Sequence, residues 1–276
     1  MTIRAVREYL SQPNPVIDNR IDKASSVSNE DMEDWPEVPK ATKLRITSAY
    51  IEDSIGWLLD AKLDLPDDNA ELADTAKIAF DERSFEHTFT RGPAALVANL
   101  LVIMGKALAH VPEYPQLCLV SGSSGKSDNK IGKPDWAVVP STTPARKIHT
   151  NKAPGDTKGT KKEYEPDKPL SLWTEKYFRQ MSHYMKERRT RYSWIITPKE
   201  IMIIRRRISQ KTNEVIPQVA KFSWVPKRNQ KMPVAVVLFF IVFASGLNNG
   251  VQATYEDFAV ENMVVLEKIK AAVERL

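Results

Sequence analysis

The chain has 276 residues, of which 42% are hydrophobic and 27% are charged, and its formal net charge is +5. This composition is ordinary for a globular protein, with length for one large domain or for one domain and appendages. The single cysteine, Cys118, cannot form an internal disulfide, and no Cys/His group has zinc spacing, which argues against a secreted disulfide scaffold and a zinc module.

The N-terminal segment, residues 1–42, is predicted to be disordered or linker-like. Its prolines and the acidic stretch SSVSNEDMEDWPE leave little apolar surface to bury. Charge and proline also interrupt the start of the chain before the apolar core of a signal peptide could form. We therefore expect residues 43–276 to make up a single domain, and removal of residues 1–40 to leave the stability nearly unchanged.

Apolar residues at helical spacing dominate the next part of the chain. They predict a helix over 44–63, as an N-terminal helical extension, and mostly helix over 69–109 with a break near Gly92–Pro93.

Beyond residue 115 the pattern changes to short apolar runs bounded by glycine, serine or proline. Strands are predicted over 116–122 and 135–141, and residues 151–162 are a weaker candidate because Pro154 and Gly155 interrupt them. A helix and two further strands then follow in order, at 170–190, 191–197 and 200–209. This order predicts an α/β fold with a mixed central sheet flanked by helices.

The longest apolar run, residues 233–247, is shorter than the 18 or so residues that a membrane helix needs, and it is predicted to be a core helix. A C-terminal helix is expected over 255–275. With neither a signal peptide nor a transmembrane helix in view, we expect an intracellular protein of the cytoplasm or nucleus.

Acidic residues and a lysine coincide with the predicted strands. Asp135 lies at the edge of one strand, and Asp156 and Lys158 project to the same face of the next because residues i and i+2 of a strand share a face. Two carboxylates held close repel unless a divalent cation lies between them, and Mg²⁺ prefers such oxygen ligands. The lysine could orient or deprotonate a metal-bound water, which is chemistry suited to phosphodiester hydrolysis.

The segments KPDWAVV, PGDTK and RQMSHY together resemble the PD-(D/E)XK nuclease superfamily, and most resemble the nuclease-like domains of many fungal proteins. The similarity covers roughly residues 70–245 and implies a restriction-endonuclease-like αβββαβ core. It implies Mg²⁺ as cofactor, with Mn²⁺ as an alternative, and nucleic acid as partner, with DNA favoured over RNA.

Site residues follow from the same resemblance. Asp135 would be the first metal ligand, Asp156 the second, and Lys158 the catalytic lysine. An acid of the first helix, Glu82 or as second choice Glu86, would complete the metal site. The Gln-x-x-x-Tyr pair of the following helix corresponds to Gln180, which would join the catalytic residues, and Tyr184, which would contact nucleic acid or pack in the core.

Each half of the motif is a common short sequence, so simpler interpretations of these residues stay open. Pro-Asp and Asp-x-Lys each occur three times in the chain. Asp135 could be a turn or cap acid, and Lys158 could belong to a solvated lysine run.

Charge is unevenly distributed along the chain. Residues 1–100 contain 11 Lys/Arg and 19 Asp/Glu, whereas residues 101–276 contain 29 and 16. A basic excess of this kind suits a phosphate-binding surface, although it also describes a solvated face. The candidates for phosphate contacts are Arg188, Arg189, Arg191, Arg205, Arg206 and Arg207.

Three functions remain open from the sequence. The first is a Mg²⁺-dependent nuclease that cuts DNA or RNA. The second is a catalytically inactive nuclease-like module that binds nucleic acid or a partner protein. The third is an interaction or toxin-like protein in which the fold serves a regulatory role.

Overall fold

The computed structural model describes residues 2–14, 16–21, 42–43, 46–67, 78–79, 81–121, 134–142, 151–160, 164–165, 171–225, 232–247 and 250–276. The helices are α1 (Val6–Leu10), α2 (Ser48–Leu59), α3 (Glu82–Arg91), α4 (Pro93–Leu108), α5 (Leu172–Glu187), α6 (Val234–Leu247) and α7 (Phe258–Val273). The strands are β1 (Thr2–Ala5), β2 (Asp18–Asn19), β3 (Thr42–Lys43), β4 (Lys62–Leu65), β5 (Ile78–Ala79), β6 (Leu117–Ser121), β7 (Trp136–Pro140), β8 (Gly155–Thr157), β9 (Tyr192–Ile196), β10 (Glu200–Ile208) and β11 (Val215–Ser223).

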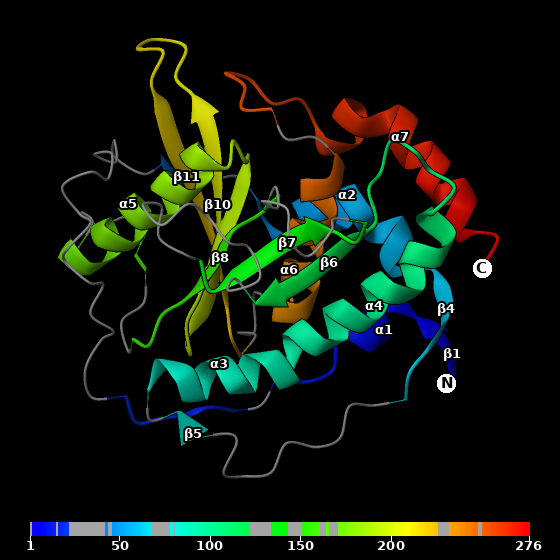
Figure 1. Cartoon of the computed structure of the whole chain (residues 1–276), viewed down its shortest axis with the longest axis horizontal. Helices are drawn as coiled ribbons and strands as arrows, with labels where there is room; N and C mark the ends of the chain where they lie inside the picture. Colours follow the sequence, from blue (N-terminus) through cyan, green and yellow to red (C-terminus); the bar gives the residue numbers. More distant parts are fainter. Residues whose placement is uncertain are drawn as a thin grey trace.

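A mixed sheet forms the centre of the molecule (Figure 1). Its strand order is β3-β11-β10-β9-β8-β7-β6. The pairs β8–β9 and β3–β11 are parallel, and the other neighbours are antiparallel. Helix α5 connects the parallel strands β8 and β9. The predicted α/β class with a mixed, helix-flanked sheet is confirmed.

Helix α5 covers one face of the sheet. The predicted helix at 170–190 is confirmed by α5, and its apolar stripe packs on alternate positions of the neighbouring strands. The buried side chains of this layer are Tyr164, Tyr177, Phe178, Met181, Tyr184, Met185, Ile195, Met202, Ile204 and Val219.

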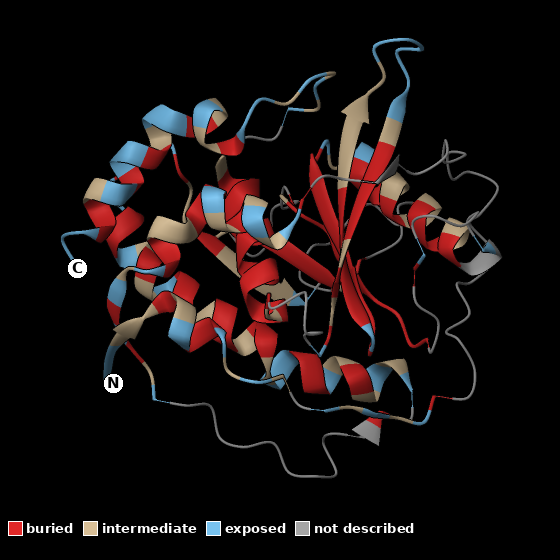
Figure 2. Ribbon diagram, turned by 180° about the vertical axis from the view of Figure 1, so that it is seen from behind, coloured by how far each residue is buried: buried red, intermediate tan, exposed pale blue. Residues whose placement is uncertain are grey.

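Helix α6 covers the opposite face and is buried on all sides from Val234 to Gly246. A helix that is apolar all round needs cover all round. The sheet contacts one side of it, and α1, α2 and α4 contact the rest. Figure 2 shows α6 and the middle of the central sheet as buried, while the tip of the β10–β11 hairpin is exposed. The run at 233–247 is therefore the core helix that its length predicts.

Helices α3 and α4 meet at Gly92, as the predicted break at Gly92–Pro93 requires. Together, Glu82–Leu108 are the one stretch of the described residues long and apolar enough to cross a membrane, and half of its most apolar window is buried within the fold. A buried core helix passes the same test of length and composition, so this stretch is weak evidence for a membrane span.

The N-terminal residues differ from the prediction. Residues 2–10 form β1 and α1, and β1 pairs antiparallel with β4, 60 residues further along the chain. Val6, Tyr9 and Leu10 are fully buried in the main core. The expectation that the first 42 residues are linker-like is therefore wrong for residues 2–14, because a short apolar segment packs on distant partners. Residues 22–41, which carry the acidic stretch, lie outside the described residues.

Shortening Leu10 tests this correction. Leu10→Ala is expected to lower the free energy of unfolding by about 2–5 kcal/mol, because it removes buried methyl groups and leaves a cavity. Ile3→Ala is the matched control, since Ile3 is 73% exposed. Urea unfolding of both variants measures the difference. Equal stability of the Leu10 variant and the wild type would restore the linker interpretation.

Candidate active site

The two aspartates of the sequence motif come together where β7 and β8 lie side by side (Figure 1). Asp135 immediately precedes β7, and its Oδ2 accepts a hydrogen bond of 2.8 Å from the backbone N–H of Thr157 in β8. Asp156 is 2% exposed, and its carboxyl is close enough to that of Asp135 for a side-chain hydrogen bond. Asp135 therefore connects two strands and is not an isolated turn acid.

Lys158 follows β8 and is 6% exposed, so it is not part of a solvated lysine run. Its backbone N–H donates to the carbonyl of Ile196, which extends the pairing of β8 with β9 by one residue. Its Nζ lies 2.5 Å from Oδ2 of Asp156 and 5.5 Å from the ring centre of Tyr177. The sequence did not indicate this aromatic neighbour on α5.

Helix α3 places the acid of the first helix at the same site. Asp81 caps the helix by accepting from the backbone N–H of Ser84, whose hydroxyl in turn accepts from the N–H of Asp81. Glu82 is therefore fixed in the first turn, and its Oε2 accepts a 3.0 Å hydrogen bond from the N–H of Gly159. Glu86, the second choice, lies one turn further along, where burial and then the charge of Asp135 raise its pKa.

Helix α5 contributes the Gln-x-x-x-Tyr pair from the other side. Gln180 Nε2 donates a 2.9 Å hydrogen bond to the hydroxyl of Tyr184. Tyr184 is buried, and its pKa is raised by burial first and then by the charge of Asp156. Because the side chain is buried, its predicted contact with nucleic acid is not available at the surface. Oε1 of Gln180 is buried and has no hydrogen-bond partner among the described residues.

The electrostatics of the aspartate pair suit a cation. Burial raises the pKa of the Asp156 carboxyl well above its usual range, and the Asp135 carboxyl raises it further, while Lys158 acts in the opposite direction. Two acids this close repel each other when both are ionised. Apart from Lys158, no described residue supplies a partner to Oδ2 of Asp156. Asp135 and Asp156 thus fit a divalent cation that prefers oxygen ligands.

For Lys158, burial and the neighbouring charges have opposite effects on the pKa. Burial lowers its pKa, but the negative charges of Asp156, Glu82 and Asp135 outweigh burial, and the net shift is upward. As an ammonium ion, this side chain can hold an anion or orient a water molecule.

Glu82, the third expected metal ligand, already has a backbone partner. One carboxylate oxygen of Glu82 is already used by the backbone of Gly159. Within the described part of the chain, no group of three or more His, Cys, Asp or Glu side chains is arranged to hold a metal ion. The geometry thus brings together two carboxylates, and Glu82 anchors the residue that follows Lys158.

Gly155 explains why the weak strand candidate forms a strand at all. A Cβ at this position would lie 2.1 Å from the indole of Trp194 in β9, so the backbone approaches the ring as only glycine allows. Trp194 also stacks near Trp136 and Phe89, and Trp136 donates a hydrogen bond to the hydroxyl of Thr157. This aromatic packing beneath β8 turns Asp156 and Lys158 towards α5.

Adding a methyl group at this position tests the packing. Gly155→Ala is expected to lower the free energy of unfolding by about 1–3 kcal/mol, because the core cannot accept the added volume. Gly105→Ala in α4 is the control, since a Cβ there meets ordinary contact with Gln116 at 3.7 Å, and alanine favours a helix. Chemical denaturation compares the two. An unchanged Gly155 variant would mean that Trp194 does not fix β8.

Arg191 is not placed for phosphate contact. It is 3% exposed, and its two terminal nitrogens pair with both carboxylate oxygens of Glu261 at 2.6 and 2.9 Å. Its guanidinium also lies 3.8 Å from the ring centre of Tyr255. The expectation that Arg191 binds nucleic acid is therefore wrong, because the side chain is buried and already paired with Glu261.

The three arginines of β10 also hold protein groups. Arg205 donates to Gln218, Arg206 to the carbonyl of Met185 and Arg207 to the carbonyl of Ala253. Arg205 pairs with Tyr192 at one end of β9, and Thr157 of β8 pairs with Ile196 at the other end. Tyr192 and Ile196 are four residues apart. At about 3.3 Å per residue this is roughly 13 Å along the strands. The β10 arginines lie at the opposite end of the sheet from Lys158.

The last two arginine candidates end α5. Arg188 is half-buried at the C-terminal cap, and Arg189 is exposed with a positive φ of 52°. Neither contacts the aspartate pair in any described interaction, so their proposed role in nucleic-acid binding stays a prediction.

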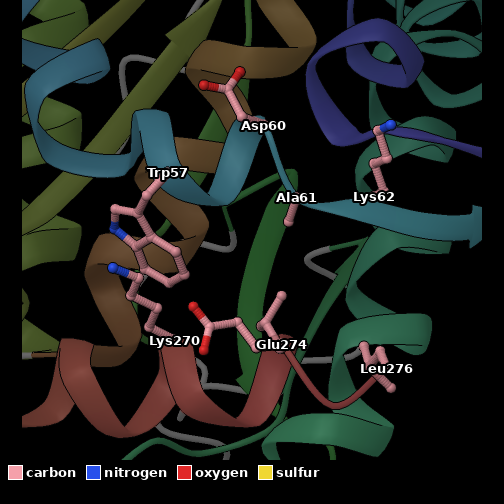
Figure 3. Close-up of a pocket in the computed structure, with 8 residues that line it drawn as sticks. Trp57, Asp60, Ala61, Lys62, Lys270, Glu274 and Leu276 are labelled. Carbon is pink, nitrogen blue, oxygen red and sulfur yellow. The ribbon is translucent and has the colours of Figure 1, made fainter.

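A cavity of about 300 Å³ lies elsewhere, between α2, β4 and α7. Figure 3 shows its walls, where Trp57 faces Lys270 and Glu274. None of the residues predicted for the site lines this cavity. The hollow therefore does not mark the aspartate site.

Comparison with known proteins adds no family. No protein-family model, no curated protein and no solved structure matches the chain.

Proposed function

We propose that this chain is a Mg²⁺-dependent nuclease that hydrolyses phosphodiester bonds, and that its core is restriction-endonuclease-like. The order α3-α4-β6-β7-β8-α5-β9, in which α3 and α4 are two parts of one helical stretch that breaks at Gly92, supports the αβββαβ part of the proposal. The observation that carries it is the meeting of Asp135, Asp156 and the ammonium of Lys158 at one point between α3 and α5.

Asp135 and Asp156 are the residues that would hold the metal. When bound, Mg²⁺ would supply positive charge to the phosphate and make a bound water more acidic. Hydrolysis adds the elements of water across the P–O ester bond and releases an alcohol and a phosphate monoester. The protein must therefore bind the diester, hold the attacking water and stabilise the added negative charge.

Lys158 suits the last of these tasks. Its Nζ lies 2.5 Å from Oδ2 of Asp156, beside the proposed metal position, so we assign it to charge stabilisation and water orientation. Glu82 keeps the lysine's neighbour Gly159 in place, and Gln180 with Tyr184 closes the α5 side. The unpartnered Oε1 of Gln180 is available to accept a hydrogen bond from a bound water or substrate hydroxyl.

A second function is favoured by burial. Asp156 and Lys158 are almost inaccessible and already paired with each other, which also suits a nuclease-derived module that binds without cutting. Incubation of the purified protein with labelled single-stranded DNA, duplex DNA and RNA, in Mg²⁺, Mn²⁺ or EDTA, separates the two. The nuclease proposal expects cleavage that EDTA stops. Retarded but uncut nucleic acid supports the binding module, and neither binding nor cleavage overturns both.

A further inference from the structure

The chain that follows Lys158 is fixed at several points. Gly159 is held by Glu82, and the carbonyl of Thr160 accepts a hydrogen bond from Asn19 of the N-terminal segment at 3.5 Å. The next described residues are Tyr164 and Glu165. Tyr164 is buried, with its ring edge-on to Phe178 of α5. A buried backbone segment of this kind needs partners for its polar groups.

A charged pair from two adjacent strands satisfies Tyr164. Oε1 of Glu200, in β10, accepts a 2.6 Å hydrogen bond from the backbone N–H of Tyr164. Nζ of Lys221, in β11, donates a 2.5 Å hydrogen bond to the backbone carbonyl of the same residue. The two side chains lie 3.4 Å apart, so each charge is balanced by the other. We call this arrangement the Glu200–Lys221 clamp.

The clamp lies on the same face of the sheet as the aspartate site. Glu200 alternates with Met202 and Ile204, which pack beneath α5, and Lys221 is level with Met202. Asp156 is level with Ile195 of the same layer. Both ends of the connection between Lys158 and Tyr164 are thus fixed beside α5.

Burial of the Glu200 carboxylate costs free energy unless its contacts compensate for the lost water. It is 2% exposed, and a buried carboxylate needs both a counter-charge and hydrogen bonds. An apolar residue at this position would suit the layer of Met202 and Ile204, but it could not hold the N–H of Tyr164. Charge-assisted hydrogen bonds are also the stronger kind, which suits a fixed anchor.

We propose that Glu200 and Lys221 are positioning residues, which hold Tyr164 so that the chain after β8 keeps Lys158 beside Asp156. This proposal rests on the proposed nuclease function for its kinetic consequence. Its structural consequence, an ordered backbone at residues 158–160, does not depend on any activity. The two can therefore be tested apart.

The test uses Glu200→Gln and Lys221→Met in the full chain. Glu214→Gln and Lys211→Met are matched controls, because they make the same chemical changes at exposed positions of the β10–β11 hairpin. Hydrogen exchange followed by mass spectrometry reports the backbone amides of residues 158–160. Faster exchange there is expected in the clamp variants and not in the controls, because the segment opens locally more often.

The kinetic arm measures cleavage. The clamp variants are expected to lower kcat by about 10–100-fold, as loss of a residue that orients a functional group does, while KM and Mg²⁺ affinity change little. In a Lys158→Ala background, Glu200→Gln should have no further effect, because the clamp acts through that lysine. The conservative change Lys221→Arg should retain most of the activity, since it keeps the charge opposite Glu200.

The outcomes are distinct. If the clamp variants exchange as slowly as the wild type at residues 158–160, the clamp does not position this segment and the proposal is overturned. If exchange accelerates but the wild type cuts nothing, the positioning role stands and the nuclease function fails. Equal losses of kcat with and without Lys158 would show that the clamp acts by another route. A variant that loses the whole fold in thermal unfolding shows a general structural role, which also overturns the proposal.

Discussion

Asp135→Asn and Asp156→Asn are each expected to abolish Mg²⁺-dependent cleavage while the protein stays folded. Each change removes one negative charge and preserves the shape of the side chain. The two carboxyls lie within hydrogen-bonding distance of one another, so one cation can bind both. Either carboxylate alone lacks the negative charge that a divalent cation needs. Calorimetric titration with Mg²⁺ should show weakened binding in both variants, in parallel with the loss of activity.

Lys158→Ala separates charge stabilisation from metal binding. Mg²⁺ affinity should persist, because both aspartates remain. The cleavage rate should fall by about 10²–10³-fold, the usual effect of losing one group that stabilises developing charge.

The matched controls are Asp60→Asn and Lys62→Ala, since Asp60-Ala-Lys62 is another Asp-x-Lys tripeptide and both side chains are exposed. They should leave cleavage unchanged. The result that would contradict the site is full Mg²⁺ binding in either Asn variant. A loss of about 3–5 kcal/mol of stability in Asp156→Asn, with metal binding intact, would instead identify its ion pair with Lys158 as structural.

The order of the main elements could be predicted from the sequence because each is a local pattern. Helix α5 has an apolar stripe at helical spacing, α6 is a long apolar run, and the strands β6, β7, β9 and β10 each contain a short apolar run. Strand β11 was not predicted, and its sequence VIPQVAKFS is interrupted by a proline, which is unusual within a strand. Strand β11 is stabilised by its long antiparallel pairing with β10, which the sequence of the segment alone does not indicate.

Segments with few apolar residues of their own were the least predictable. Strand β8 has three residues, and its buried position depends on Gly155 fitting beneath Trp194, 39 residues away in the chain. Helix α1 is likewise short, and its burial depends on the rest of the main core. In both cases the decisive contacts join parts of the chain that no local window includes.

The candidate site was predictable in part for the same reason. A motif supplied Asp135, Asp156 and Lys158, and the structure brings them together. The clamp residues Glu200 and Lys221 belong to no motif. One signal was present, since Glu200 is the single acid at the start of an otherwise apolar and basic strand. A charge in such a place has a partner more often than not.

The arginines show the limit of charge counting. A basic excess cannot distinguish side chains that face solvent from side chains that hold the fold together. Glu261, the partner of Arg191, is 70 residues further along the chain. The basic half of the sequence therefore overstates the positive surface that nucleic acid could reach.

Breaking the buried pair of Arg191 and Glu261 is expected to cause a large loss of stability. The pair joins the start of β9 to the first turn of α7, and Tyr255 covers the guanidinium. Arg191→Met would leave the carboxylate of Glu261 buried without its counter-charge. Such a change costs about 3–5 kcal/mol, because the remaining charge has lost water and partner together.

The surface pair of Arg7 and Glu52 provides a matched control with similar geometry. Its two contacts measure 2.5 and 2.8 Å, but both side chains are more than a third exposed. Arg7→Met is therefore expected to cost no more than about 1 kcal/mol, since water replaces the lost partner. Urea unfolding of the two variants under the same conditions should show this difference directly.

The double variant Arg191→Met with Glu261→Leu completes the experiment. Replacing both charges by apolar side chains should recover most of the stability, because no buried charge is then left unpaired. If Arg191→Met leaves stability intact and instead weakens nucleic-acid binding with a shallower salt dependence, the arginine is a phosphate contact after all. In that case the buried pair does not form in solution, and the start of α7 must lie differently against β9.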